Sequence, residues 1–153
     1  MQDNLHNIRR SFEKGSLSKK TIDPNPIQQF RTWFLEARDS EMVEDVNAMT
    51  LCTLGLDGIP TGRVVLLKAY DEYGFYFYTN YKSDKGRAID LCDKVSLIFF
   101  WPSLERQIII KGKASKTSKE DSKRYFDSRP LGSRLGAILS MQSQVIETRK
   151  ILD

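Results

Sequence analysis

Histidine and cysteine are nearly absent from this chain. Its 153 residues contain one histidine, His6, and two cysteines, Cys52 and Cys92, which lie outside any CxxC spacing. A Ser-His-Asp triad or a multi-histidine metal site has almost no residues from which to form. A disulfide scaffold or zinc site is equally unsupported, and this cysteine content is typical of a reducing cytoplasm. If the chain is an enzyme, a cofactor is expected to supply the difficult chemistry.

Long apolar runs are absent as well. No stretch approaches the length of a membrane span, and the polar N-terminus has no apolar signal-peptide region. A soluble, cytoplasmic protein is therefore expected. The net charge of +4 is modest, and 40% hydrophobic with 29% charged residues are ordinary globular values. Such a charge suits phosphorylated small molecules at least as well as nucleic acid, which usually requires a dense basic face.

The length suits one domain with a real core. Residues 1–22 are polar and basic and are predicted to form a flexible arm or a frayed helix, followed by a single domain over 23–153. Asn25 and Pro26 give a helix-start signal, and an apolar stripe from Ile27 to Ala37 predicts a core-facing helix.

Alternating patterns and turn residues then predict strands. The predicted strands cover residues 49–56, 62–70, 75–80, 95–101 and 107–115, with turns at 57–58, 71–74 and 102–103. Ser83 can cap a short helix that ends near Leu91. Further helices are predicted from a capping box at 117–120 as far as Pro130, over 133–140, and near Val145. Strands linked mostly by hairpins indicate a mainly β fold with peripheral helices (α+β), organised as an antiparallel barrel.

Two cations stand at the ends of an apolar strand in Arg63-Val-Val-Leu-Leu-Lys68. A guanidinium fork matches phosphate oxygens, and the lysine adds a point charge. Tyr78-Thr79-Asn80 follows on an aromatic segment, and Lys85 comes soon after it. A single strand-end cation is usually solvated, so the hypothesis of an anion site depends on the whole set.

A second set of polar residues crosses a predicted helix end. Tyr125, Arg129 and Ser133 are spaced at i, i+4 and i+8 around Pro130. A phenol, a guanidinium and a hydroxyl that converge there suit a phosphate monoester. The alternative interpretation is a helix stopped by proline, with Arg129 opposing the helix dipole.

These motifs, together with Glu105-Arg106-Gln107 and Ser140-Met-Gln142-Ser143 in this order, resemble the pyridoxamine 5'-phosphate oxidase family. The family consists of flavoenzymes that bind flavin mononucleotide (FMN). The resemblance covers nearly all of the chain and implies an antiparallel split β-barrel of the FMN-binding type. It also implies a homodimer with FMN at the interface, and neither nucleic acid nor a membrane as a partner.

The resemblance implies a role for each matching residue. The implied cofactor-binding residues are Arg63, Val64, Val65, Leu66, Leu67, Lys68, Tyr78, Thr79, Lys85, Gln107, Gln142 and Ser143. The implied substrate-binding residues are Arg9, Lys68, Tyr125, Arg129 and Ser133. Gln107, Gln142 and Ser143 are implied to come from the partner subunit. No catalytic acid or base is assigned, and no metal ligand is expected.

The implied activity is the oxidation of pyridoxamine or pyridoxine 5'-phosphate to pyridoxal 5'-phosphate. FMN would accept a hydride from the exocyclic carbon of the substrate, and O2 would reoxidise the flavin and give peroxide. The protein would contribute positioning and electrostatics.

The chain departs from the family pattern at three places. Asp84 stands where the family has an arginine on the FMN phosphate, which predicts weaker FMN retention. Phe12 replaces a tyrosine of the arm that covers the substrate. The family also continues beyond Asp153 with a tryptophan-glycine-glycine stretch and an Arg-Leu-His sequence that nothing here matches, so a truncation or completion by another polypeptide is expected.

Two alternative functions remain open. A non-catalytic or degenerate FMN-binding split-barrel protein would bind the flavin without turnover. A small basic β-barrel for single-stranded nucleic acid would use Lys111, Lys113, Lys116 and Lys119 with nearby aromatic residues. These lysines are also typical of a solvated strand end and helix start.

Overall fold

The structure is a computed structural model that describes residues 4–145. The chain divides into two compact units. One unit comprises Met1–Val46 and Phe100–Gln107, and the other comprises Asn47–Phe99 and Ile108–Asp153. The single domain expected over 23–153 stays a prediction.

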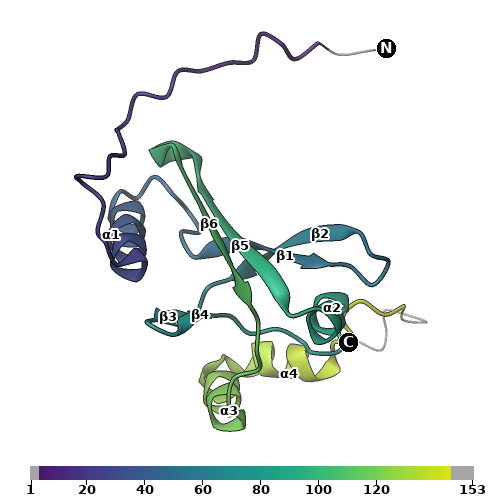
Figure 1. Ribbon diagram of the computed structural model, residues 1–153. Coiled ribbons are helices and arrows are strands. Elements are labelled where there is room, and N and C mark those ends of the chain that lie inside the picture. The colour runs from purple at the N-terminus through teal and green to yellow at the C-terminus, as the bar shows by residue number, and fades with distance from the viewer. Residues whose placement is uncertain (1–3, 146–153) are drawn as a thin grey trace. The chain divides into compact units, whose positions relative to one another are not determined.

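A four-stranded sheet has the order β2-β1-β5-β6 (Figure 1). Its strands are β1 (Ala48–Leu54), β2 (Pro60–Leu66), β5 (Lys94–Trp101) and β6 (Arg106–Lys113). β1 pairs antiparallel with both β2 and β5. Met49, Leu51 and Thr53 alternate along β1 as its buried residues, which is the period of a strand with one face on a core.

The predicted turn between β1 and β2 is confirmed. Gly58 has φ 80°, a left-handed conformation in which glycine meets no Cβ penalty, and its N–H bonds the carbonyl of Gly55. The Asp57 carboxylate accepts a hydrogen bond of 3.0 Å from the backbone of Ile59. This closed turn fixes the register that places Leu51 opposite Arg63.

The single strand predicted over 62–70 is wrong, because the chain changes sheets at Leu67 and Lys68. The Leu67 N–H bonds the carbonyl of Asn47, whereas the Lys68 N–H bonds the carbonyl of Tyr76. A second, two-stranded sheet follows, made of β3 (Ala69–Asp71) and β4 (Gly74–Tyr76). Lys68 therefore lies at the switch between the two sheets.

The strand predicted over 75–80 is also shorter than expected. β4 ends at Tyr76, which pairs with Ala69, the first residue of β3. Beyond that pair, residues 77–80 have no strand partner in the described part of the chain, and they run as an irregular segment. Their side chains consequently become available to line a cavity.

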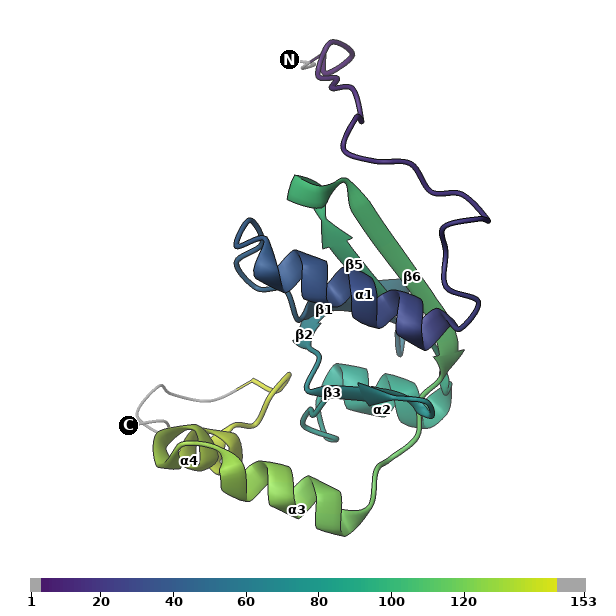
Figure 2. The same cartoon turned by 90° about the vertical axis from the view of Figure 1, so that its left-hand side faces the viewer.

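Up to residue 145, the second unit contains three short helices. These are α2 (Asp84–Leu91), α3 (Lys119–Ser128) and α4 (Leu131–Leu139), and α4 follows directly on α3 (Figure 2). Ser83 caps α2, as predicted. Ser118 rather than Thr117 caps α3, because its hydroxyl accepts from Asp121 N–H at 3.0 Å. α4 begins two residues before the predicted start, and the helix expected near Val145 lies outside the described residues.

The other unit contains α1 (Pro26–Asp39) and the turn η1 (Pro102–Leu104). The predicted cap is confirmed: the Asn25 side chain accepts from the backbone of Ile27 and Gln28. Trp101 packs edge-on against Phe34 and donates its indole N–H to Val46.

The N-terminal residues of this unit run without a helix over the described range 4–22. The Glu105 carboxylate accepts hydrogen bonds from the backbone of Glu13 and Lys14, and Arg10 donates to the carbonyl of Pro102. The arm is thereby tied to the turn between β5 and β6.

The predicted class, mainly antiparallel β-sheet with peripheral helices, is confirmed. The sheets remain open rather than closing into a complete barrel. Within residues 4–145, no helix is both long enough and apolar enough to cross a membrane.

Candidate functional site

A large open cavity of about 1810 Å³ lies in the unit Asn47–Phe99 and Ile108–Asp153. Its walls come from the end of β2, the irregular segment 77–81, the start of α2, and α3 with α4. Small-molecule sites usually measure about 300–1,000 Å³. The cavity therefore has room for more than one ligand of that size.

Most of the predicted site residues meet in this cavity. Those that line it are Val64, Val65, Leu66, Lys68, Tyr78, Thr79, Lys85, Tyr125, Arg129, Ser133 and Gln142. Leu67 is buried behind the wall, and Ser143 does not line the cavity. Arg9 and Gln107 belong to the other unit.

Arg63 stands behind the lining rather than in it. Its Nη1 donates to the Thr53 hydroxyl at 2.8 Å and to the Leu51 carbonyl at 3.1 Å, both on the neighbouring strand β1. Thr53 is buried, so its hydroxyl needs such a partner. These bonds hold the guanidinium across the sheet, and its charge contributes to the lowered pKa of Lys85.

A tight turn over residues 80–86 positions Lys85. Ser83 is completely buried; its hydroxyl donates to the Asn80 carbonyl at 2.6 Å and accepts from Gly86 N–H at 3.4 Å. A Cβ on Gly86 would lie 2.3 Å from the carbonyl oxygen of Tyr81. Only glycine lets the helix start approach this backbone so closely.

The Lys85 ammonium projects from this turn toward the cavity. It donates to the Gln142 side-chain oxygen at 3.0 Å and to the Ser83 hydroxyl at 3.3 Å. Burial, with a smaller contribution from the Arg63 charge, lowers the pKa of Lys85 despite the opposing effect of Asp84. A partly desolvated lysine beside an arginine is an environment that an anion would stabilise.

Asp84, the departure from the family pattern, points to a cation of its own helix. Its carboxylate pairs with Arg87 at 2.7 Å, an i,i+3 contact between exposed side chains. An acidic residue in a first helical turn also interacts favourably with the helix dipole. The structure therefore gives Asp84 a local role in α2.

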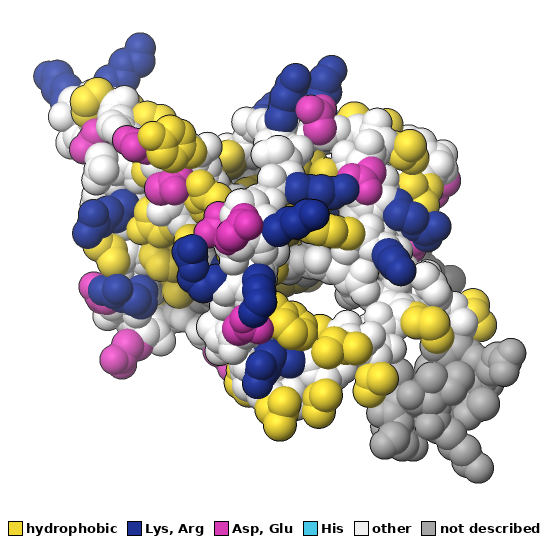
Figure 3. All heavy atoms as spheres, turned by 90° about the horizontal axis from the view of Figure 1, so that it is seen from below, with side chains coloured by type: hydrophobic (Ala, Val, Ile, Leu, Met, Phe, Trp, Pro, Cys, Tyr) yellow, Lys and Arg dark blue, Asp and Glu magenta, His cyan; other side chains and the backbone are white. Residues whose placement is uncertain are grey.

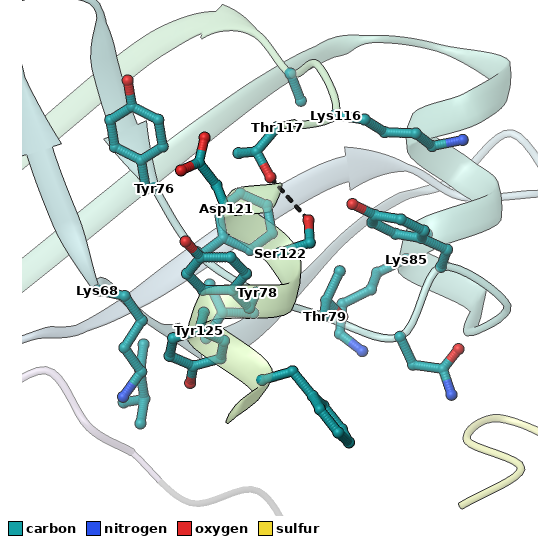
Figure 4. A pocket seen from close by; sticks show the side chains of 18 of the residues that line it. Lys68, Tyr76, Tyr78, Thr79, Lys85, Lys116, Thr117, Asp121, Ser122 and Tyr125 are labelled. Atoms are coloured by element: carbon teal, nitrogen blue, oxygen red, sulfur yellow. Dashed lines mark hydrogen bonds between the residues drawn. The ribbon is translucent and has the colours of Figure 1, made fainter. Parts of the chain in front are cut away.

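Tyr78 and Tyr125 stack in the cavity with their ring centroids 3.7 Å apart and their planes 4° from parallel. Figure 4 shows the two rings face to face, with Lys68 and Lys85 on opposite sides of the pair. Tyr78 belongs to the segment that follows β4, and Tyr125 belongs to α3. The stack thus joins an implied cofactor residue to an implied substrate residue.

The helix end predicted at Pro130 is present. Arg129 leaves the helical conformation as the C-cap of α3, and Pro130 is the N-cap of α4. Tyr125, Arg129 and Ser133 consequently reach one cavity from two successive helices. This break brings a phenol, a guanidinium and a hydroxyl to the same wall.

Two of the four lysines of the nucleic-acid alternative lie near carboxylates. Lys116 pairs with Asp90 at 2.8 Å and sits over the Tyr81 ring, and Lys113 lies 3.9 Å from Asp93. On the face seen in Figure 3, Lys and Arg side chains are interspersed with Asp and Glu. Among the described residues, no group of three or more His, Cys, Asp or Glu side chains could hold a metal ion.

Sequence reasoning missed the roles of three residues that shape the site. The alternation of β1 could have placed Thr53 on the buried face, where a hydroxyl requires a partner. Gly86 directly follows the capped start of a helix, a position where glycine is unfavourable without a packing reason. The side-chain bond of Asn80 to the Ser140 carbonyl joins positions 60 apart and has no local signal.

Comparisons with known proteins agree with this geometry. The family described as pyridoxamine 5'-phosphate oxidase matches residues 35–153. The pyridoxine/pyridoxamine 5'-phosphate oxidase of Flavobacterium johnsoniae is 54% identical over 99% of this chain and 71% of its own length. The protein of the same name from Christiangramia forsetii is 51% identical over 100% of this chain and 72% of its own.

Two solved structures share the fold. PhzG from Burkholderia lata 383, in complex with tetrahydrophenazine-1-carboxylic acid, has a TM-score of 0.82 at 24% identity, over 90% of this chain and 68% of its own. A pyridoxamine 5'-phosphate oxidase-related, FMN-binding protein from Nostoc punctiforme has a TM-score of 0.65 at 16% identity, over 86% and 72%. The family match and the two close relatives decide the assignment: this chain belongs to the pyridoxamine 5'-phosphate oxidase family.

Proposed function

We propose that this chain oxidises pyridoxamine 5'-phosphate and pyridoxine 5'-phosphate to pyridoxal 5'-phosphate, with FMN as cofactor and O2 as electron acceptor. One observation carries the proposal beyond family membership. A single cavity contains Lys85 at one subsite and Tyr125 with Arg129 at another, and the Tyr125 ring stacks on Tyr78. Two phosphate esters and two planar rings are the ligands that such a cavity would suit.

The residues of the cavity fit FMN. Lys85, with the Arg63 charge nearby, supplies the cations for a phosphate. Val64 and Leu66 expose 68% and 42% of their surface toward solvent and line the cavity, so an aromatic ring system could cover them. The Gln142 amide adds hydrogen-bonding capacity for ring heteroatoms.

The substrate phosphate would lie at Tyr125, Arg129 and Ser133. Arg129 is half-buried at the helix break, and its guanidinium can bind two phosphate oxygens at once. Lys68 lines the same cavity from the switch between the sheets, where it can approach either ligand. Binding of the phosphate would orient the substrate ring and its exocyclic carbon.

When bound, FMN supplies the hydride acceptor and the reactivity with O2 that no side chain of this chain offers. The residues of the chain bind and orient the two ligands and exclude water from the space between the rings. The proposal assigns no catalytic acid or base to any side chain. Positioning therefore supplies the contribution of the protein to the rate.

We also propose a homodimer with FMN at the interface. Phe100 and Ile109 expose 63% and 51% of their surface, as expected of side chains that a second subunit would cover. Gln107 would reach FMN from the partner subunit. Sedimentation of the FMN-loaded protein at twice the monomer mass supports this arrangement, and a monomer that retains FMN and turnover contradicts it.

The decisive experiment combines two measurements. FMN is added to the purified protein and its visible spectrum is recorded, after which pyridoxal 5'-phosphate formation from pyridoxamine 5'-phosphate is assayed. A perturbed flavin spectrum with product formation supports the proposal. A protein that leaves the spectrum of free flavin unchanged contradicts it.

A second candidate is flavin binding without oxidation of B6 vitamers. Asp84 favours it, because a carboxylate stands where the family places an arginine on the FMN phosphate. Phe12 favours it as well, since it lacks the hydroxyl of the family tyrosine. A perturbed flavin spectrum with no pyridoxal 5'-phosphate would select this candidate.

A further inference from the structure

Helices α3 and α4 carry the three residues of the proposed substrate-phosphate subsite, yet neither helix contains a buried residue. We call residues 119–142, which contain both helices, the helical segment. Burial of apolar surface is the main force that fixes one element on another. The position of the helical segment must consequently depend strongly on specific contacts.

Three such contacts come from one stretch, residues 78–85, which we call the cofactor turn. The Tyr78 ring stacks on Tyr125 at 3.7 Å. The Asn80 side-chain amide donates to the Ser140 carbonyl at 3.3 Å. The Lys85 ammonium donates to Gln142 at 3.0 Å. The contacts therefore follow the helical segment from the middle of α3 to the residues beyond α4.

The cofactor turn is itself firmly built. The Asn80 carbonyl accepts from the Ser83 hydroxyl, and the Asn80 side-chain oxygen accepts from the Lys82 backbone at 2.8 Å. The close approach of Gly86 to Tyr81 fixes the same turn against α2. Asn80 thus bonds both the turn that presents Lys85 and the end of α4.

We propose that the cofactor turn couples the two phosphate subsites, with Asn80 as the positioning residue. FMN bound at Lys85 would raise the affinity of the subsite at Tyr125, Arg129 and Ser133, and substrate phosphate would raise the affinity for FMN. The proposal rests on the function proposed above and adds to it a linkage between its two ligands. The effect is reciprocal, because two binding free energies in one thermodynamic cycle share one coupling term.

The physical basis is the entropy cost of holding the helical segment in one position. The first ligand to bind would hold the helical segment against the firmly built cofactor turn through the three contacts, so the second ligand binds to a site already in place. Coupling between sites commonly amounts to roughly 5–150-fold in affinity. A ratio of roughly 5-fold or more between FMN affinities with and without substrate analogue is therefore expected.

Asn80 and Ser140 line the cavity, but neither has been assigned a contact with FMN or substrate, so Asn80 can test the coupling through affinity ratios measured within each protein. Asn80→Asp keeps the oxygen that accepts from the Lys82 backbone but lacks the donor for Ser140. Asn80→Ala removes both bonds. Lys82→Ala is the matched control, since Lys82 is exposed and contributes only its backbone N–H to the turn.

The experiment titrates FMN into each protein by flavin fluorescence polarisation, with and without saturating 4-deoxypyridoxine 5'-phosphate. This analogue keeps the phosphate and the ring but has no group to oxidise. The wild type and Lys82→Ala should show roughly 5-fold tighter FMN binding with the analogue. In both Asn80 variants, the gain in FMN affinity caused by the analogue should be below roughly 2-fold, because the hydrogen bond between the cofactor turn and the end of α4 is lost. The ratio within each protein cancels any direct effect on FMN of the carboxylate that Asn80→Asp introduces.

A second readout needs no ligand. Trypsin should cleave α3 at Lys123 or Arg124 faster in both Asn80 variants than in Lys82→Ala, since the helical segment is then less firmly held. If the analogue does not change FMN affinity in the wild type, or changes it equally in the wild type and the Asn80 variants, the coupling is overturned and the proposed function is left intact. Absence of FMN binding in the wild type overturns both.

Discussion

Lys85 donates a hydrogen bond of 3.0 Å to the side chain of Gln142, a residue 57 positions later in the same chain. The family resemblance implied that Gln142 reaches the flavin from a partner subunit. The contact places Gln142 at the wall of the cavity in its own subunit. The implied contributions of Gln107, Gln142 and Ser143 from a partner subunit stay predictions.

The lowered pKa of Lys85 predicts how FMN affinity depends on pH. Only the protonated ammonium attracts the phosphate, whose second pKa of about 6 keeps it a dianion throughout the alkaline range. Because burial places the pKa of Lys85 below its ordinary value, the proton is lost earlier than from an exposed lysine. FMN affinity should therefore decrease as the pH rises in the alkaline range, and the decrease should begin below the ordinary lysine pKa of about 10.4.

Equilibrium titrations of FMN at several pH values measure this decrease. Lys85→Gln, which keeps a hydrogen-bonding side chain without a charge, should bind FMN more weakly at pH 8 and show a flatter profile. The same profile in the variant and the wild type would remove Lys85 from the phosphate subsite.

Gly86→Ala should disrupt the cofactor turn. The added Cβ would lie 2.3 Å from a backbone oxygen, so the start of α2 must move. Overpacking of this kind costs about 1–3 kcal/mol of unfolding free energy, and FMN affinity should fall with it. Denaturant unfolding and FMN titration measure the two effects.

Gly132→Ala is the matched control for that substitution. A Cβ on Gly132 meets no atom within 4 Å, and the residue lies in α4. Replacing a helical glycine with alanine should stabilise the protein by up to about 1 kcal/mol. Equal losses in the two variants would contradict the packing argument for Gly86.

Asp84→Arg should tighten FMN binding and lower stability. The substitution replaces a carboxylate beside Lys85 with a cation, for which a gain of about 1 kcal/mol, or roughly five-fold in affinity, is expected. It also removes the exposed pair with Arg87 and an acidic residue from the first turn of α2, at about 0.3–1 kcal/mol each. The FMN affinity of Asp84→Asn should lie between that of the wild type and that of Asp84→Arg. Unchanged FMN affinity in Asp84→Arg would argue against a phosphate at this helix start.

Tyr125 should contribute separately through its ring and its hydroxyl. Tyr125→Phe keeps the stack on Tyr78 and removes one hydrogen bond, so KM for pyridoxamine 5'-phosphate should rise roughly 2- to 10-fold with little change in kcat. Tyr125→Leu also removes the stack, worth about 0.5–1.5 kcal/mol, and should raise KM further. Steady-state kinetics decide this; identical kinetics in the two variants would show that the stack has no role.

The elements that carry strong local signals could be predicted from the sequence. Asn25, Ser83 and the Asp57-Gly58 turn each involve hydrogen bonds or backbone conformations within a few residues, and the structure places all three as expected. The Tyr125 to Ser133 motif likewise depends on local spacing around Pro130. These features follow from residue chemistry at short range.

The features of the fold and the site that could not be predicted depend on contacts between residues far apart in the sequence. Nothing in the apolar run that ends at Leu67 indicates that the chain will leave β1 and pair with β4. The switch depends on backbone hydrogen bonds to two distant residues, Asn47 and Tyr76. Residues 77–80 have the aromatic composition of a strand but lack a partner strand within the described range. The bonds from Asn80 to Ser140 and from Lys85 to Gln142 depend on tertiary structure in the same way.

The most direct test of the account is anaerobic mixing of the FMN-loaded protein with pyridoxamine 5'-phosphate, followed by admission of O2. The account predicts that flavin absorbance near the visible maximum bleaches anaerobically as one equivalent of pyridoxal 5'-phosphate per FMN forms, and that the absorbance returns when O2 reoxidises the flavin. A bound flavin that stays oxidised in the presence of saturating substrate would contradict it.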